Sequence, residues 1–211
     1  ISEIYIPDRF SPIWGSRVRS GGCQGWPMAK TFDALNEKLR AFIDKQKVFF
    51  VATAPLTADG HVNVSPKGLD GTFAILDDRS VAYLDLTGSG VETIAHLREN
   101  GRICVMFCAF DGPPRIVRVH GTGEAVEPGD ERFAALISHF ADYPAVRAII
   151  VVHATRISDS CGYGVPLYSY EGERDQLQRW AERKGEDGIA QYKRDNNTES
   201  LDGLPSLLGD H

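Results

Sequence analysis

The 211-residue sequence predicts a mainly β protein, an antiparallel barrel with peripheral helices. Runs of β-branched and aromatic residues recur along the chain, and short turn-forming segments join most of them. Strands joined in this way pair antiparallel, because parallel strands need a crossover of a dozen or more residues. A count of about seven such strands, with helices inserted at intervals, favours a small barrel over a doubly wound nucleotide-binding fold.

The first half of the chain predicts one helix and four strands. Thr31 can cap a helix whose apolar side chains repeat at helical spacing to about Gln46. The Asp59-Gly60 pair predicts a hairpin between the β-branched run that precedes it and the run that follows it. The strands expected here are 48–54, 61–65, 72–76 and 80–86.

The second half predicts three more strands and several helices. A helix over 91–99 should end at Asn100-Gly101, which is typical of a C-cap. Strand 148–157 is almost unbroken in its apolar character, so we expect it to be central and buried on both faces. The other elements expected are strands 102–110 and 115–126 and helices 131–141, 175–183 and 189–194.

Residues 1–27 differ from the rest, with scattered prolines and no periodicity. Two interpretations stay open: an extension added ahead of a natural start at Met28, or an authentic arm that packs across the domain. Residues 28–211 are expected to form a single barrel domain that ends in C-terminal helices.

Composition and charge exclude several functional classes. The chain is 42% hydrophobic and 25% charged, as in ordinary soluble globular proteins. A net charge of −6 argues against a nucleic-acid partner, and no apolar run approaches the roughly 20 residues that span a bilayer. Four cysteines are too few for a disulfide framework at this length, so we expect a cytoplasmic protein.

A lysine and a glycine-rich loop form the most informative pattern. Lys67 ends a predicted strand, and the loop Thr87-Gly88-Ser89-Gly90 opens a predicted helix. Free N–H groups and the positive end of a helix dipole suit a phosphate. Ser89 and Glu92 also fit a capping box. The loop therefore either merely starts a helix, or binds a phosphate through its N–H groups and the hydroxyls of Thr87, Ser89 and Thr93. Lys67 is then either a further contact to the phosphate or a solvated lysine at a strand end.

Two arginines and a tyrosine are weaker candidates. Arg115 and Arg118 lie three residues apart on a strand and so face opposite ways, which lets only one reach a shared site. His120 shares the face of Arg118 and is most simply a strand residue. Tyr163 lies in a loop rich in glycine, which either approaches a ligand and stacks on its ring or is an ordinary packed turn.

Metal and nucleophile chemistry have no sequence support. Cys104 and Cys108 share a strand face but stand roughly 13 Å apart, too far for one metal ion, and are interpreted as small core residues. No metal-ligand set and no Ser-His-Asp arrangement is visible, and no catalytic acid or base can be named.

Five stretches carry a resemblance to a known family: Val62–Gly68, Tyr83–Gly90, Glu92–Arg102, Pro114–Gly121 and Ser160–Pro166. Through them the chain resembles the pyridoxamine 5′-phosphate oxidase-like superfamily of FMN-binding split barrels, in particular its oxidases of unassigned substrate. The resemblance implies an antiparallel Greek-key split β-barrel of six to seven strands. It also implies a homodimer with FMN at the subunit interface and a small-molecule substrate, hence an FMN-dependent oxidoreductase.

The resemblance also implies which residues hold the cofactor. In characterised oxidases a lysine matching Lys67 helps to hold the flavin. An Arg-Lys pair that grips the phosphate is replaced here by residues without positive charge, and Val62 stands near the place of a further arginine. The cofactor contacts expected on this basis are Ser65, Lys67, Thr87, Ser89, Gly90, Thr93, Arg115 or Arg118, and Tyr163.

Three other readings stay open. A deazaflavin coenzyme could replace FMN, or haem could do so if His120 or His153 faces an apolar pocket. The protein could also be a non-catalytic dimeric module with weak flavin affinity.

Overall fold

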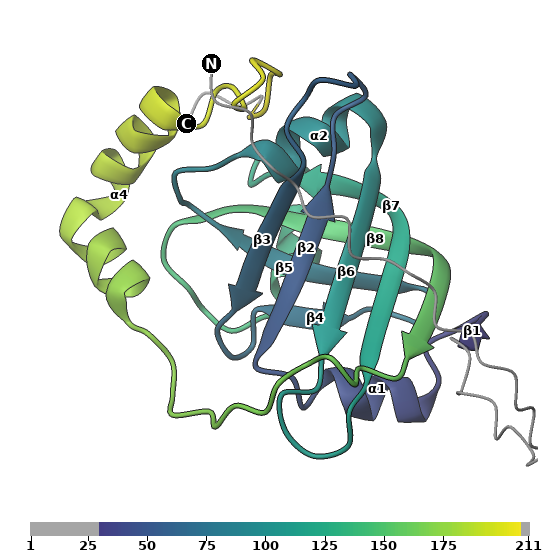
Figure 1. Ribbon diagram of the computed structural model, residues 1–211. Helices are drawn as coiled ribbons and strands as arrows, with labels where there is room; N and C mark the ends of the chain where they lie inside the picture. The colour runs from purple at the N-terminus through teal and green to yellow at the C-terminus, as the bar shows by residue number, and fades with distance from the viewer. Residues whose placement is uncertain (1–29, 208–211) are drawn as a thin grey trace, which may run out of the picture.

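The computed structural model describes residues 30–207, so the interpretations of residues 1–27 concern a segment outside the described residues. The fold is a single sheet of eight antiparallel strands that curls into a split barrel (Figure 1). Seven strands follow the order β3-β2-β6-β7-β8-β5-β4, and β1 pairs with β8. The strands are β1 Lys30–Phe32, β2 Val48–Thr53, β3 Asn63–Gly68, β4 Phe73–Ile75, β5 Ser80–Leu86, β6 Arg102–Cys108, β7 Ile116–Val126 and β8 Val146–Ser160.

The topology confirms the antiparallel Greek-key split barrel that the sequence predicts. Strands β2 and β3, β4 and β5, and β6 and β7 pair as hairpins, with Thr53 opposite Asn63 beside the Asp59-Gly60 turn. The chain then crosses between distant parts of the sheet, so that β2 lies beside β6 and β5 beside β8. Strand β3 is left at one end of the strand order, where no strand among residues 30–207 pairs with its second edge.

Four helices surround or close the barrel: α1 Glu37–Ile43, α2 Glu92–Asn100, α3 Phe133–Ile137 and α4 Gln176–Asn196. Helix α2 packs on β2, β6 and β7 and buries Ile94 and Leu97. Helix α4 runs along the outside of the barrel, as Figure 1 shows, and breaks at Gly185, where φ is 65°. Trp180 contacts Tyr192 across this break, with ring centroids 5.0 Å apart.

Several predicted boundaries are wrong; for example, the strand expected over 61–65 is Asn63–Gly68. The helix expected from Thr31 does not start there, because residues Lys30–Phe32 pair with β8 as β1. Helix α1 begins only after Asn36, whose side chain accepts a hydrogen bond from Leu39 N at 3.1 Å. The helix expected over 131–141 shortens to α3, and the strand expected over 148–157 extends to Val146–Ser160.

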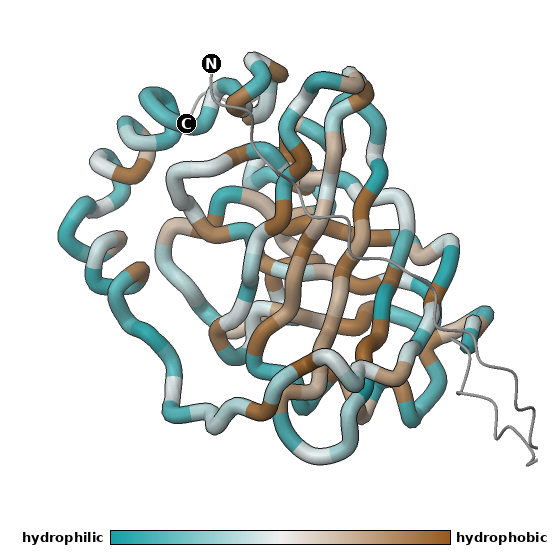
Figure 2. Tube along the Cα trace, in the orientation of Figure 1, coloured by the Kyte–Doolittle hydropathy of each residue, from teal (hydrophilic) through white to brown (hydrophobic). Residues whose placement is uncertain are grey.

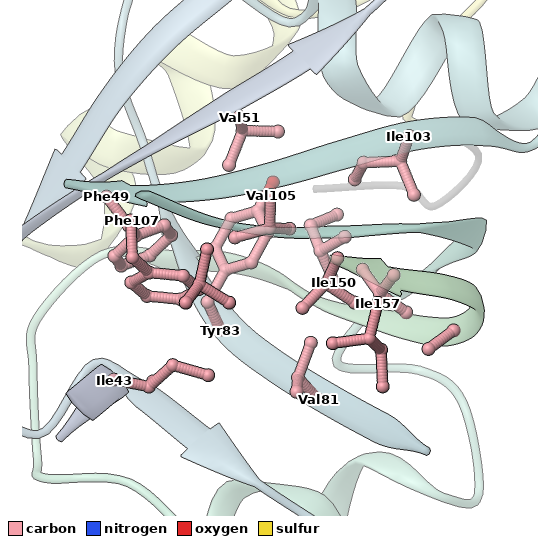
Figure 3. Packing of buried hydrophobic residues seen from close by; sticks show 14 of the residues in the cluster. Ile43, Phe49, Val51, Val81, Tyr83, Ile103, Val105, Phe107, Ile150 and Ile157 are labelled. Carbon is pink, nitrogen blue, oxygen red and sulfur yellow. The ribbon is translucent and has the colours of Figure 1, made fainter. Parts of the chain in front are cut away.

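The core lies inside the curled sheet. Aromatic rings from four strands meet there, and Figure 3 shows those of Phe49, Tyr83 and Phe107. The ring centroid of Phe107 lies 5.7 Å from that of Phe49 and 5.1 Å from that of Phe73. A second cluster, which includes Leu84 and Ile149, packs the other face of β5 and β8 against α3. Figure 2 shows these apolar stretches crossing the sheet. Strand β8 is therefore buried on both faces over most of its length, as its apolar run predicts.

Among the described residues, no helix is both long and apolar enough to cross a membrane.

Candidate functional site

A row of polar side chains lies along one face of the edge strand β3. Asn63, Ser65 and Lys67 alternate with Val64 and Pro66, so the polar side chains point one way and the exposed apolar ones the other. Asn63 Nδ2 donates to Thr93 Oγ1 at 3.1 Å, and Ser65 Oγ donates to the side chain of Asn63 at 2.8 Å. The row thus connects β3 to the start of α2 at the open side of the barrel.

Lys67 belongs to a charged network that holds the open side of the barrel together. Lys67 Nζ lies 2.8 Å from Asp85 Oδ1 on β5, and Arg147 Nη2 on β8 lies 2.7 Å from Asp85 Oδ2. Asp85 is fully buried and Arg147 is 3% exposed. Burial raises the pKa of Asp85, but the charges of Lys67 and Arg147 outweigh it, so the pKa stays below its ordinary value. The carboxylate is therefore ionised and shared by two cations.

Sequence reasoning missed Asp85 and Arg147. The available signal was one acidic and one basic residue inside otherwise apolar strands, Ser80–Leu86 and Val146–Ser160. Such residues are almost never fully buried unless they are paired. Because the two strands are adjacent in the sheet, the pairing follows from the topology rather than from the spacing.

The predicted capping box is wrong. Helix α2 begins at Glu92 after Val91, and no side chain caps it. Glu92 is therefore the first helical residue and not the third, so its carboxylate cannot make the reciprocal bond of a capping box. It folds back toward Gly90, where a Cβ atom would lie 2.5 Å from Glu92 Oε2. The first turn keeps its N–H groups but receives a negative side chain of its own.

The two threonines of the predicted phosphate site have partners inside the chain. Thr87 is fully buried and donates to Ala145 O at 2.9 Å. Thr93 is 6% exposed and accepts the hydrogen bond from Asn63. Neither hydroxyl is directed to solvent.

A segment that we call the C-terminal cap, residues 197–204, covers the loop between β5 and α2. Asn197 Nδ2 donates to Gly88 O at 3.0 Å, and Leu201 N donates to Glu92 Oε1 at 3.4 Å. Asp202 Oδ2 accepts from His61 N at 2.8 Å, and its Oδ1 lies 2.6 Å from His61 Nδ1. The sequence showed this segment only as a polar tail, because nothing in its composition indicates where it docks.

The docking of the C-terminal cap should depend on pH. Its hydrogen bond with Asp202 raises the pKa of His61 above the ordinary 6.5, and the same bond lowers the pKa of Asp202 below 3.8. Protonated His61 stabilises the contact below about pH 6.5, and this contribution is lost as the pH rises through the raised pKa. The contribution of Asp202 is present above about pH 3.8 and is lost as the pH falls further.

We therefore expect hydrogen exchange of peptides from the cap, corrected for intrinsic rates, to be slowest between about pH 4 and 6.5. In His61→Gln the protection of these peptides should no longer fall as the pH rises into the alkaline range. Protection that keeps rising above pH 8 in the native protein would contradict this assignment.

Arg115, Arg118 and Tyr163 gather at another part of the barrel. Arg115 Nη2 lies 2.8 Å from Asp159 Oδ2, and Arg118 Nη1 donates to Ser160 Oγ at 3.1 Å. The loop of Tyr163 joins them, because Gly162 lies against the backbone of Arg115, where a Cβ would be 2.7 Å from Arg115 N. The ion pair of Arg115 and the hydrogen bond of Arg118 both go to the end of β8, whereas Lys67 pairs with Asp85 on β5.

The two histidines weighed as haem ligands differ: His153 is exposed, whereas His120 is half-buried and its Nδ1 has no hydrogen-bond partner among the described residues. The side chain of His153 is 61% exposed, with Nδ1 3.2 Å from Ser80 Oγ, so it does not face an apolar pocket. Burial and the nearby charges of Arg118 and Arg156 lower the pKa of His120. Across residues 30–207 no group of three side chains is placed to hold a metal ion. Cys108 is buried as expected, but Cys104 is only half-buried on the outer face of β6.

A cleft of about 570 Å³ opens beside Lys67. Most of its wall is apolar, and two cations, Lys67 and Arg174, border it. Small-molecule sites are typically clefts of this size, with apolar walls and a few placed polar groups. The other lining residues are Pro66, Gly68, Leu69, Leu84, Leu86, Gln176 and Leu177.

Fold and site together define a split β-barrel with a small-molecule-sized cleft beside its edge strand. The family model described as pyridoxamine 5′-phosphate oxidase matches residues 35–161. The pyridoxamine 5′-phosphate oxidase family protein ustO of Aspergillus flavus is 42% identical over 194 residues, which cover 83% of this chain and 77% of that protein. The chain belongs to the pyridoxamine 5′-phosphate oxidase family.

Two solved structures with similar folds were also found. HupZ of Group A Streptococcus aligns at a TM-score of 0.47 and 23% identity, over 59% of this chain and 98% of that one. A protein of Mesorhizobium loti described as FAD-binding aligns at a TM-score of 0.45 and 17% identity, over 63% of this chain and 96% of that one.

The residues present fit one end of FMN and not the other. Ser65 and Lys67 lie at the open side of the barrel, and Lys67 borders an apolar cleft, which suits a flat ring with a polar edge. At the loop between β5 and α2, the threonine hydroxyls are used inside the chain, and Glu92 puts a negative charge at the helix start. The donor set there does not match a phosphate dianion.

Proposed function

We propose that this protein is a flavin-dependent oxidoreductase acting on a small-molecule substrate, with the flavin ring held in the cleft beside Lys67. The observation that carries the proposal is the position of Lys67, which borders the apolar cleft while Asp85 fixes its ammonium group at 2.8 Å. Family membership supports the same conclusion.

When bound, the flavin supplies the hydride chemistry. The residues of the chain would bind and orient it. Lys67 offers a cation and N–H donors to the polar edge of the ring, and Asp85 with Arg147 limits the movement of that lysine. Leu84, Leu86 and Leu177 give the cleft walls that exclude water.

The charge of the cleft indicates a substrate class. Its only ionisable lining residues in the described part of the chain are Lys67 and Arg174, both cationic. A substrate that carries a carboxylate or another anionic group would be attracted to this cleft, whereas a cationic amine would be repelled.

We further propose that two copies of the chain pair through the outer face of β3. Val62 and Val64 are 70% and 62% exposed there, although both are apolar. Val64 lies on β3 and Val62 directly precedes it, and no strand in the described part of the chain pairs with the second edge of β3. Natural proteins usually cover or charge such an edge. Association of two copies would cover this surface and border the site with residues from both chains.

Replacing Lys67 with methionine is expected to weaken flavin binding about tenfold or more, because hydrogen bonds to charged groups contribute about 1.5–3 kcal/mol. The measurement is a fluorescence titration with riboflavin, alongside urea unfolding of both proteins. The unfolding free energy should fall by only about 1 kcal/mol, since Arg147 still neutralises Asp85.

Lys47→Met is the matched control, because Lys47 also pairs with an aspartate, Asp70, at 3.2 Å, but on an exposed surface. It should leave flavin affinity unchanged. Equal affinity of the native protein and Lys67→Met would remove Lys67 from the site. Failure of the native protein to bind any flavin would contradict the proposed function.

A second candidate is a dimeric module that binds flavin weakly and catalyses nothing. One observation favours it: Lys67 pairs with Asp85, so the carboxylate offsets the positive charge that a ligand would meet. A stopped-flow experiment separates the two candidates. The flavin-loaded protein is mixed with a small anionic alcohol or aldehyde as the electron donor, without dithionite, and reduction of the flavin is followed. Reduction by such a donor supports the enzyme, and flavin that binds but is never reduced supports the module.

A further inference from the structure

The end of the proposed flavin site at the start of α2 is closed by groups of the chain itself. We propose that this protein binds the flavin without gripping a terminal phosphate, so that it binds riboflavin about as tightly as FMN. This inference rests on the proposed flavin site and specifies which form of flavin it accepts. Three observations carry it.

The first is the charge at the helix start. Glu92 is the first residue of α2, and its carboxylate lies over the loop at Gly90. Negative side chains are favourable at a helix N-terminus, so Glu92 already fills the role that an anion would take there. A phosphate at the same place would meet a like charge.

The second is the C-terminal cap. Asn197 Nδ2 donates to Gly88 O at 3.0 Å, and Leu201 N donates to Glu92 Oε1 at 3.4 Å. Polar groups of the loop and of Glu92 are thus satisfied from within the chain, and a further carboxylate, Asp202, is bound at His61 beside them. A phosphate would have to displace this segment before it could reach the loop.

The third observation is that the cations nearest to the loop already have partners within the chain. Arg147 donates to Asp85, to Asn197 Oδ1 at 2.9 Å and to Gly88 O at 3.5 Å, and it is 3% exposed. Its guanidinium therefore has partners and cannot reach solvent. Lys67 also pairs with Asp85, and in the proposed site it faces the polar edge of the ring rather than the start of α2. The residues Thr87 to Thr93 contain no lysine or arginine.

A site that grips phosphate would discriminate strongly. One hydrogen bond to a charged group contributes about 1.5–3 kcal/mol, equivalent to roughly 10- to 150-fold in affinity. Two such contacts would make FMN at least about a hundredfold tighter than riboflavin. We expect instead a ratio within about threefold, because among the described residues the two cations nearest to the loop, Lys67 and Arg147, are both paired with Asp85, and Glu92 would repel the phosphate.

The test is a fluorescence titration of the full chain with riboflavin and with FMN, in the native protein and in two variants. Glu92→Gln keeps the shape and removes the charge, and it should shift the ratio toward FMN by about 2- to 5-fold. Glu92→Lys supplies a cation, and it should shift the ratio by about tenfold or more. Glu99→Gln, at the other end of the same helix, is the control and should leave the ratio unchanged.

The outcomes separate the two proposals. Similar affinity for both flavins in the native protein, together with the expected shifts of the affinity ratio in Glu92→Gln and Glu92→Lys, supports the inference. A native preference for FMN of tenfold or more overturns it but leaves the flavin site intact. Binding of neither flavin contradicts the proposed function itself, and the inference with it.

Discussion

Replacing Asp85 with asparagine is expected to lower the free energy of unfolding by about 3–5 kcal/mol, the usual cost of leaving a buried charge without its partner. Asp85 is fully buried and is the carboxylate shared by Lys67 and Arg147. Asparagine has nearly the same shape, so little of the loss would come from packing. The loss comes from Arg147, whose side chain is 3% exposed and cannot turn to water.

Urea unfolding followed by circular dichroism measures this change. Asp159→Asn is the control, because Asp159 also meets an arginine, Arg115, at 2.8 Å, but both members of this pair are partly exposed. Its cost should stay near the 0–1 kcal/mol of surface pairs. Equal effects of the two substitutions would show that the network around Asp85 does not hold β3, β5 and β8 together.

Replacing Phe107 with alanine is expected to cost about 3–5 kcal/mol, through lost burial and the cavity left behind. Phe107 is 2% exposed, and its ring contacts those of Phe49 and Phe73, which come from separate strands. The cavity would lie between strands of the curled sheet, whose hydrogen-bonded pairing limits collapse.

The same unfolding measurement applies, with Phe110→Ala as the matched control. Phe110 lies two residues beyond β6, is half-buried and stacks on Tyr168 at 5.6 Å, outside the aromatic core. It should lose about 1 kcal/mol. A loss below about 1 kcal/mol in Phe107→Ala would mean that the aromatic cluster is not the centre of the fold.

The barrel could be predicted from the sequence because its signals are local. The Asp59-Gly60 turn predicted the hairpin of β2 and β3, and the apolar run predicted the buried strand β8. Both predictions are confirmed. The start of α1 could not be predicted in this way. Phe32 has helical spacing to later residues, but its pairing with Ile157 is a contact between distant parts of the chain.

The candidate site was predictable only in part. Lys67 and Ser65 were found from their strand and the resemblance, and the structure places them together on β3. The partners that define their chemistry, Asp85 and Arg147, become neighbours only through the sheet order. The C-terminal cap carries no local signal at all, since its docking depends on single hydrogen bonds such as that of Asn197 with Gly88.

The central claim is that the cleft beside Lys67 holds a flavin. The most direct measurement is the visible absorbance of the 211-residue chain after incubation with excess riboflavin and removal of the unbound ligand. We predict retained flavin absorbance in the native protein and a large reduction of it in Lys67→Met. A native protein that stays colourless after this treatment, and after the same treatment with FMN, would contradict the account.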